Sequence, residues 1–314
     1  MKNIAIFASG AGTNTENIIK HFKNSTIANV KLVLSDNKNA YVLERAKNLD
    51  VPVITFSKKE FNSIDNKEKY LGILKEKEID YIILAGFLSK IPEYIINEYP
   101  EKILNIHPAL LPKFGGKGMY GANVHRAIID NNEDESGITI HIVDNEYDHG
   151  DNIFQTICRV EPDETAESLE TKIHSLEKEY FPIVIEQYIL NGKNTIIEGM
   201  SYTSTTIVCE NNSAIKMGSG NLPVFATPSM IALMENAAMN VVTAKLAKGL
   251  TTVGGSISST HLKPSIYGKT IKATAILEKI DRKKLIYKVA AYDGKTLIGE
   301  GDHIRFIVKE DFYK

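Results

Sequence analysis

The feature that most constrains this chain is a regular alternation of strand-like and helix-like segments over its first 190 residues. Short apolar runs have the length and composition of buried strands, and they lie at 4–7, 30–34, 51–56, 81–84, 103–106 and 137–143. Patterns with helical spacing occur around 18–22, 40–49 and 66–77, and a long helix is predicted at 165–190, opened by a Thr cap and interrupted by Pro182. This alternation predicts an α/β fold with an open, mostly parallel sheet and helices on both faces.

The pattern changes at the turn-like segment 190–193. The residues after it contain several long strand patterns and one helix pattern at about 228–248. One helix among antiparallel strands predicts an α+β module of about 120 residues, which is within the usual range for a domain. We therefore expect two domains, at 1–192 and 197–314.

The composition excludes several classes of protein. A hydrophobic fraction of 43% and a charged fraction of 24% are typical of a soluble globular chain. The formal net charge of -2 gives no electrostatic basis for binding nucleic acid or an anionic membrane surface. No apolar run reaches the roughly 20 residues that span a bilayer. The two distant cysteines indicate a reduced, cytoplasmic protein with no disulfide framework.

A glycine-rich turn follows the first predicted strand. Gly10 and Gly12 would let the backbone approach an anion closely, and the following helix would direct its amides toward a phosphate. A tight turn without a ligand is the simpler alternative. The turn also resembles part of a dinucleotide fingerprint, with Asp36 as the ribose-binding acid, but Thr15 stands at the third glycine position. A nicotinamide-dependent oxidoreductase therefore stays open as an alternative on these residues.

The segment around Asn105 and His107 is the most informative. Alternate residues of a strand share a face, so the two side chains are expected to emerge together near the end of a parallel strand, where open α/β sheets bind ligands. An amide donor beside a protonatable imidazole suits the oxyanion that develops during acyl transfer to an amine. The structural alternative is a histidine that hydrogen-bonds a loop.

An acidic loop at 143–151 offers a carboxylate that could orient His107 and raise its pKa. The alternatives are a solvated acidic turn or a metal site. The metal alternative rests on four side chains without the usual ligand spacing, so no metal is expected. These are Asp144, Asp148, His149 and Asp151.

These pieces, in this order, resemble the glycinamide ribonucleotide formyltransferase family over residues 1 to about 190. The motifs that carry the resemblance are SGAGTN at 9–14, LAGFL at 84–88, LNIHPALLP at 104–112 and DHG at 148–150. The resemblance implies an enzyme of purine biosynthesis that moves a formyl group from 10-formyltetrahydrofolate to the amine of glycinamide ribonucleotide. It implies His107 as general acid, Asn105 as support for the oxyanion and Asp148 as the group that tunes His107.

The resemblance also implies binding residues. The phosphate of the ribonucleotide would be held by Gly12, Thr13 and Asn14, and the folate pocket would be walled by Leu88, Ser89, Lys90, Ile91, Asn105 and the loop from Asp144 to Asp148. Glu177 matches a position that contacts the ribonucleotide, and His174 stands where glutamine is expected.

Two features depart from the pattern. The segment 113–121 is longer and richer in glycine, which suggests a mobile lid, and an arginine expected near 61–66 for the folate tail is missing.

Residues from about 197 resemble a hot-dog thioesterase of the fluoroacetyl-CoA thioesterase group. The matching stretches are PVFATP at 223–228, MENAA at 234–238, STH at 259–261 and GEGDH at 299–303. The resemblance implies that Thr227, Glu235 and His261 hydrolyse a thioester, with an acyl-CoA as substrate and a homo-oligomer as the assembly. Thr227 could instead be only a helix cap, and the module could be a non-catalytic acyl-CoA sensor or a dimerisation unit.

Overall fold

A seven-stranded sheet organises the first part of the chain. Its strand order is β3-β2-β1-β4-β5-β6-β7. The strands from β3 to β5 run parallel, whereas β6 is antiparallel to β5. The strands are β1 Lys2–Phe7, β2 Ala28–Ser35, β3 Val53–Thr55, β4 Tyr81–Leu84, β5 Ile103–His107, β6 Glu135–Ile142 and β7 Asn152–Arg159. The predicted open, mostly parallel sheet is confirmed, and β7 is a strand that the sequence pattern missed.

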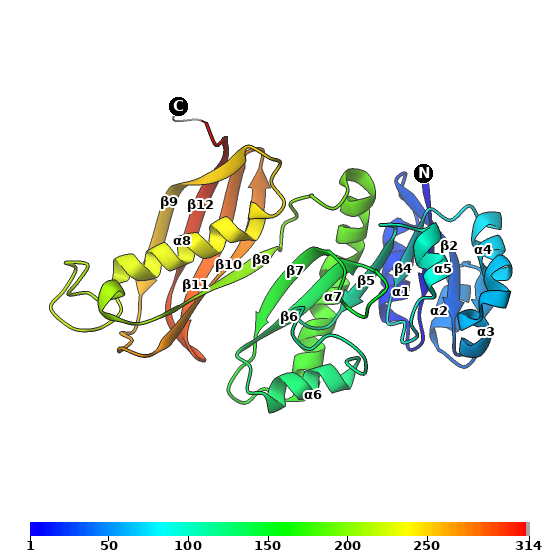
Figure 1. Ribbon diagram of the computed structural model, residues 1–314, viewed down its shortest axis with the longest axis horizontal. Coiled ribbons are helices and arrows are strands. Elements are labelled where there is room, and N and C mark those ends of the chain that lie inside the picture. The colour runs from blue at the N-terminus through cyan, green and yellow to red at the C-terminus, as the bar shows by residue number, and fades with distance from the viewer. Residues whose placement is uncertain (312–314) are drawn as a thin grey trace. The chain divides into compact units, whose positions relative to one another are not determined.

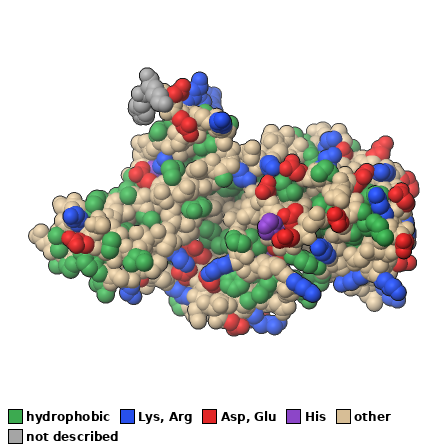
Figure 2. Space-filling view, viewed as in Figure 1, with side chains coloured by type: hydrophobic (Ala, Val, Ile, Leu, Met, Phe, Trp, Pro, Cys, Tyr) green, Lys and Arg blue, Asp and Glu red, His purple; other side chains and the backbone are tan. Residues whose placement is uncertain are grey.

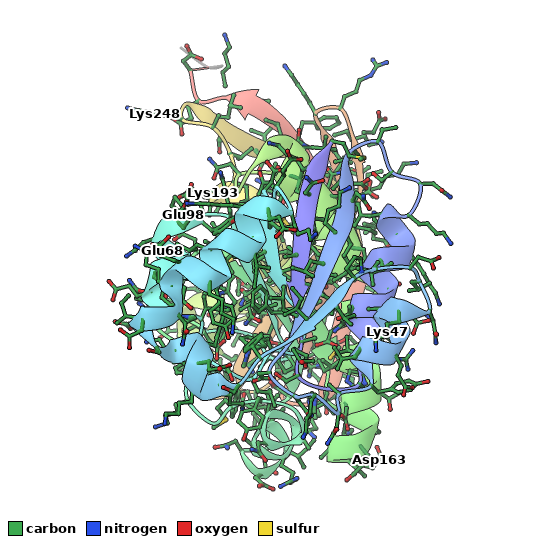
Figure 3. The ribbon with its side chains drawn as sticks, turned by 90° about the vertical axis from the view of Figure 1, so that its right-hand side faces the viewer. Lys47, Glu68, Glu98, Asp163, Lys193 and Lys248 are labelled. Carbon is green, nitrogen blue, oxygen red and sulfur yellow. The ribbon has the colours of Figure 1, made fainter. Side chains whose placement is uncertain are left out.

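Helices cover both faces of this sheet (Figure 3). Side chains of α3, α4 and α5 pack with Ala5 and Phe7 of β1 in a core rich in aromatic rings. Lys47, Glu68 and Glu98, labelled in Figure 3, are exposed residues of α2, α4 and α5. The helices are α1 Thr13–Phe22, α2 Val42–Lys47, α3 Lys58–Asn62, α4 Lys67–Glu76, α5 Glu93–Glu98, α6 Ala122–Asp130 and α7 Ala166–Asn191, with a short 3-10 helix η1 at Ile64–Asn66.

Helix α7 begins and ends close to the predicted positions. The Thr165 hydroxyl accepts a hydrogen bond from the Ser168 amide at 3.2 Å, which confirms the predicted cap. The predicted interruption at Pro182 is wrong, because the helix runs through this residue to Asn191. Pro182 is itself buried, together with Phe181 and Ile185. We infer that packing against the sheet offsets the hydrogen bond that proline removes.

The second part of the chain contains a five-stranded antiparallel sheet of order β8-β10-β11-β12-β9, against which α8 packs (Figure 1). This arrangement of one long helix on an antiparallel sheet confirms the predicted hot-dog module. The strand β9 lies at one edge of the sheet, and within residues 1–311 it pairs with β12 alone. The elements are β8 Ser201–Ile207, a 3-10 helix η2 at Glu210–Asn212, α8 Thr227–Thr243, β9 Leu250–His261, β10 Thr270–Asp281, β11 Lys284–Asp293 and β12 Thr296–Lys309.

This computed structural model describes residues 1–311. The chain divides by its internal contacts into two units. Unit 1 contains Met1–Asn132, Gly137–Phe154 and Thr165–Gly192, and unit 2 contains Glu133–Ser136, Gln155–Glu164 and the residues from Lys193 onward. Within the described residues no helix is long and apolar enough to cross a membrane. On the face drawn in Figure 2, basic and acidic side chains are interspersed.

We predict that Phe61→Ala lowers the free energy of unfolding of unit 1 by about 3–5 kcal/mol, because the ring is fully buried among Phe7, Phe56 and Tyr70. Scanning calorimetry of the full chain measures this as a lower transition temperature for unit 1 alone. The matched control is Ile64→Ala in the neighbouring 3-10 helix, whose side chain is 66% exposed. An equal effect of the two substitutions would show that Phe61 is not part of the core.

Candidate functional sites

A cavity of 710 Å³ lies within unit 1. It brings together the glycine-rich turn at 10–14, the end of β5, the loop at 116–121 and the face of α7 that carries Glu170, His174 and Glu177. Asn105, His107 and Asp148 also line it. Segments that are far apart in the sequence therefore meet at one place, at the carboxyl ends of the parallel strands, where this type of sheet binds ligands.

The glycine-rich turn opens α1 without a side-chain cap. Gly12 has φ 78°, and a Cβ atom there would lie 2.4 Å from a side-chain carbon of Val42, so the position needs glycine for both conformation and space. The amide of Asn14 donates to a carboxylate oxygen of Glu177 at 2.9 Å. Burial raises the pKa of Glu177, although the bond from Asn14 opposes this. The turn and α7 are therefore linked at one wall of the cavity.

The three residues predicted to carry the chemistry lie together. Asn105 and His107 are on β5, and Asp148 is on the loop after β6. A carboxylate oxygen of Asp148 lies 3.5 Å from Nδ1 of His107, and the other lies 3.5 Å from Nδ2 of Asn105. The amide of Gly116 donates to Asp148 at 2.9 Å. A carboxylate, an amide and an imidazole therefore share one wall of the cavity.

His107 is 3% exposed, and its surroundings have opposing effects on the charged form of the ring. Nε2 lies 2.8 Å from the carbonyl oxygen of Phe114, while Nδ1 faces Asp148. Two oxygen acceptors favour the protonated ring, but burial has the larger effect and lowers the pKa of His107 below its usual value. The sequence predicted a pKa raised by the nearby carboxylate. That prediction is corrected, because the cost of desolvating the charged ring outweighs its attraction to Asp148.

Asp148 keeps its charge despite its burial. Burial alone would raise the pKa of Asp148, but the neighbouring rings of His141 and His107 and the bond from the Gly116 amide together lower it. Asp148 also has φ 53°, a left-handed conformation that is uncommon outside glycine. The loop thus holds an ionised carboxylate against a mostly neutral imidazole.

The residues predicted to wall a folate pocket are only partly together. Leu88 lines the cavity, whereas Ile91 is buried in the core beneath it. Ser89 donates to Asp36 at 2.5 Å. Lys90 lies over the Tyr147 ring, 5.9 Å from its centroid. Asp144 lines a separate pocket of 420 Å³.

The sequence left open a dinucleotide site and a metal site, and the side chains on which these alternatives depend make other contacts. The side chain of Asp36 is 1% exposed and contacts Ser89 and Lys58, so it is not open to a ribose. In the acidic loop, Asp144 pairs with His149 at 2.9 Å while Asp148 turns toward His107. Over residues 1–311, no group of three or more His, Cys, Asp or Glu side chains is arranged to hold a metal ion.

Sequence reasoning missed two buried histidines at this site. His141 lies on β6 directly opposite Asn105, and its Nε2 is 3.0 Å from the Asn105 amide nitrogen. His125 on α6 lines the cavity, and its buried Nδ1 has no hydrogen-bond partner among residues 1–311. Each is a polar residue on a buried face, at Ile140–Ile142 in β6 and beside Val124 in α6. A histidine among buried apolar residues was the feature of the sequence that could have indicated these two positions.

A second candidate site lies within unit 2. The hydroxyl oxygen of Thr227 is 2.8 Å from Nδ1 of His261, and both residues line a pocket of 350 Å³ with Leu222, Phe225 and Leu262. Burial lowers the pKa of His261, and its Nε2 is buried without a hydrogen-bond partner in the described part of the chain. The cap proposed for Thr227 is wrong, because α8 has Ala226 at its cap position and Thr227 makes no capping bond.

Glu235 lies apart from this pair. It is eight residues further along α8, which is about 12 Å of helix rise. Its carboxylate lies 3.7 Å from Nε2 of His303. His303 contacts the buried Arg305, whose guanidinium also donates to Thr252. Within a single chain, Thr227 and His261 therefore lie together, and Glu235 belongs to a separate charged cluster with His303 and Arg305.

Comparison with known proteins agrees with this geometry. The family model described as formyl transferase matches residues 2–185. The chain belongs to the formyl transferase family. A Bacillus subtilis phosphoribosylglycinamide formyltransferase is 34% identical over 196 residues, which cover 62% of this chain and 98% of the relative. The crystal structure of the Bacillus halodurans phosphoribosylglycinamide formyltransferase is 34% identical, with a TM-score of 0.56, and the match covers 63% of this chain and all of that one.

Other comparisons extend and limit this assignment. The chloroplastic phosphoribosylglycinamide formyltransferase of Arabidopsis thaliana is 36% identical over 187 residues, or 58% of this chain. The chain spans only 64% of the length of that relative. A second family model, described as fluoroacetyl-CoA-specific thioesterase, matches residues 208–311. Unit 2 thus has a family match of its own.

We predict that Asp148→Asn moves the titration of His107 to lower pH, because it removes the charge that opposes the effect of burial. The imidazole proton signals of His107 in an NMR titration measure this. The matched control is Asp144→Asn, which removes the carboxylate that raises the pKa of His149 and leaves the His107 titration in place. A rise in the pKa of His107 in the Asp148→Asn variant would contradict the electrostatics described above.

Proposed function

We propose that residues 1–192 transfer a formyl group from 10-formyltetrahydrofolate to the amine of glycinamide ribonucleotide, a step of de novo purine biosynthesis. The observation that carries the proposal is that Asn105, His107 and Asp148 line the same cavity as the glycine-rich turn at 10–14. The family match and the names of the relatives support it. The two free cysteines support a cytoplasmic setting, and we place the boundary between the two domains at 192–197.

The two substrates would enter the cavity from different sides. The phosphate of the ribonucleotide is assigned to Gly12, Thr13 and Asn14 at the start of α1, where the amides and the helix dipole favour an anion. Glu177 and His174 face this side of the cavity from α7. The folate is assigned to the side of Leu88, Tyr147 and Asp148, and the contacts of Ser89, Lys90, Ile91 and Asp144 with it stay predictions.

Transfer requires an N–C bond to form and another to break. The amine nitrogen attacks the formyl carbon, and the oxyanion of the tetrahedral species is stabilised by the amide of Asn105 and by His107. A neutral His107 accepts the proton that the attacking nitrogen loses and returns it to the departing N10 of the folate. The ring therefore begins and ends neutral, in keeping with its lowered pKa. Asp148 stabilises the imidazolium that forms between these steps.

The free protein holds His107 in a contact that this mechanism has to break. The carbonyl oxygen of Phe114 contacts Nε2 of His107, and Phe114 belongs to the glycine-rich segment 113–121. Phe114 has φ 54°, and Gly116 and Gly118 also have positive φ. A shift of this segment on substrate binding would free Nε2, which supports its assignment as a lid.

We predict that His107→Ala lowers kcat for formyl transfer by at least about a hundredfold, because the proton then has no carrier between the two nitrogens. The intact chain is assayed with 10-formyltetrahydrofolate and glycinamide ribonucleotide. The matched control is His21→Ala on α1, where the imidazole pairs with Glu186 outside the cavity lining, and its rate is expected to equal that of the wild type. Equal rates for wild type and His107→Ala would overturn the assignment.

For unit 2 we propose acyl-CoA thioester hydrolysis, because the Thr227–His261 pair lies in a pocket and the thioesterase family model matches this region. His261 accepts the hydroxyl proton as Thr227 attacks the thioester carbon, and the proton leaves with the thiol. Water then cleaves the acyl-threonine with His261 as base. The lowered pKa of His261 keeps the ring able to accept that proton.

We further propose that a second copy of the chain completes this site. Strand β9 is a twelve-residue edge strand, and an edge with unpaired backbone groups is suited to pairing with another strand. Glu235 lies two helical turns from Thr227 in its own chain. Antiparallel pairing along β9 would bring Glu235 of the partner subunit toward the Thr227–His261 pair, which supports a homodimer with two shared sites.

We predict that Thr227→Ala and Glu235→Ala each abolish thioester hydrolysis, and that mixing the two variants under subunit exchange restores about a quarter of the wild-type rate. Release of free thiol from acetyl-CoA and butyryl-CoA is the readout. In a mixed dimer one of the two sites keeps both groups, and mixed dimers form half of the population. A mixture that stays inactive while wild type turns over would place Glu235 in the same subunit as Thr227. No turnover by the wild type would reject the thioesterase function.

A further inference from the structure

His141 is a buried histidine that the mechanism above does not use. It lies on β6, and the antiparallel register pairs it directly with Asn105 on β5. It is 2% exposed, and it is absent from the lining of the cavity. A buried imidazole directly behind a proposed reacting group costs desolvation energy unless its hydrogen bonds are satisfied. Its contacts therefore indicate what it does.

Each nitrogen of the His141 ring has a defined partner. Nδ1 lies 2.9 Å from the carbonyl oxygen of Ile142. A carbonyl only accepts, so Nδ1 carries the proton, and Nε2 of the neutral ring presents a lone pair. The Asn105 amide nitrogen lies 3.0 Å from this lone pair and donates to it. The Ile142 carbonyl thus fixes the tautomer of His141. This tautomer in turn determines that the nitrogen end of the Asn105 amide faces His141.

This contact matters because an asparagine amide has two orientations that differ by a half-turn. With His141 as acceptor, Nδ2 of Asn105 faces His141 and lies 3.5 Å from Asp148, so the donor end of the amide is turned toward these two groups. The opposite orientation would direct the amide oxygen toward Asp148, where two acceptors would face each other. Nε2 of His141 is also 3.6 Å from Asp148.

We infer that His141 is a positioning residue for formyl transfer, which holds the Asn105 amide with its nitrogen toward His141 and Asp148. The inference rests on the proposed transferase function of unit 1. His141 touches neither substrate in this assignment and acts through Asn105. An acceptor at position 141 is the chemical requirement, so an imidazole or a side-chain carbonyl fulfils it, whereas an apolar side chain of similar volume does not.

The test is a double-mutant cycle with two substitutions at position 141. His141→Leu removes the acceptor and keeps an apolar fit, and we expect it to lower kcat by about tenfold to a hundredfold while the KM values stay within about twofold. His141→Gln keeps an acceptor and is expected to retain most of kcat. In the Asn105→Ala background, His141→Leu is expected to cost nothing further, because the group that it positions is gone.

Equal losses from His141→Leu in the presence and absence of Asn105 would overturn the inference, as would equal losses from His141→Gln and His141→Leu. A second measurement is independent of turnover. In the wild type and in His141→Gln, the side-chain amide protons of Asn105 are expected to exchange slowly with solvent in NMR spectra, and in His141→Leu they are expected to exchange faster. Slow exchange in all three proteins would reject the contact. A wild type without formyl transfer but with the protected amide would reject the transferase function and leave the contact standing.

Discussion

The antiparallel pairing of β6 with β5 is the interaction on which the transferase site depends. The strands from β3 to β5 run parallel, and the reversal at β6 returns the chain so that the following loop lies over the end of β5. Asp148 on that loop thereby reaches Asn105 and His107, and His141 faces Asn105 across the strand pair. A slip of one residue in this register would turn His141 to the opposite face, away from Asn105.

Burial is the second constraint, and it determines the protonation state of the site. His107 and Asp148 are both removed from water, yet burial affects them in opposite directions, since it disfavours the charged form of each. Asp148 accepts a bond from the Gly116 amide and lies close to the rings of His141 and His107, and these contacts restore its charge. His107 has two oxygen acceptors that favour its charged form, but the effect of burial is larger and its pKa stays low. A neutral imidazole beside a fixed carboxylate can gain and lose a proton within one reaction cycle.

The sequence was sufficient for the parts of the structure that follow from local periodicity. Strand alternation placed Asn105 and His107 on one face, and the structure has them there. It failed where tertiary packing overrides local preference, as at Pro182 inside α7, and at the helix cap expected of Thr227. The contact of Thr227 with His261 was implied by the family resemblance and not by local pattern. The role of His141 depends on register between strands that are about thirty residues apart in sequence, which no single-strand pattern contains.

The two candidate sites share one physical feature, a histidine with a lowered pKa, although the folds of the two units differ. In each, a histidine whose pKa is lowered by burial lies beside its partner groups, Asp148 and Asn105 in unit 1 and the Thr227 hydroxyl in unit 2. They differ in completeness. Unit 1 assembles its carboxylate from the same chain, because one loop returns over the sheet. In unit 2 the carboxylate of Glu235 is carried on the same rigid helix as Thr227, and no loop movement can shorten the two helical turns between them. In the proposed homodimer, the second site therefore depends on assembly in a way that the first does not.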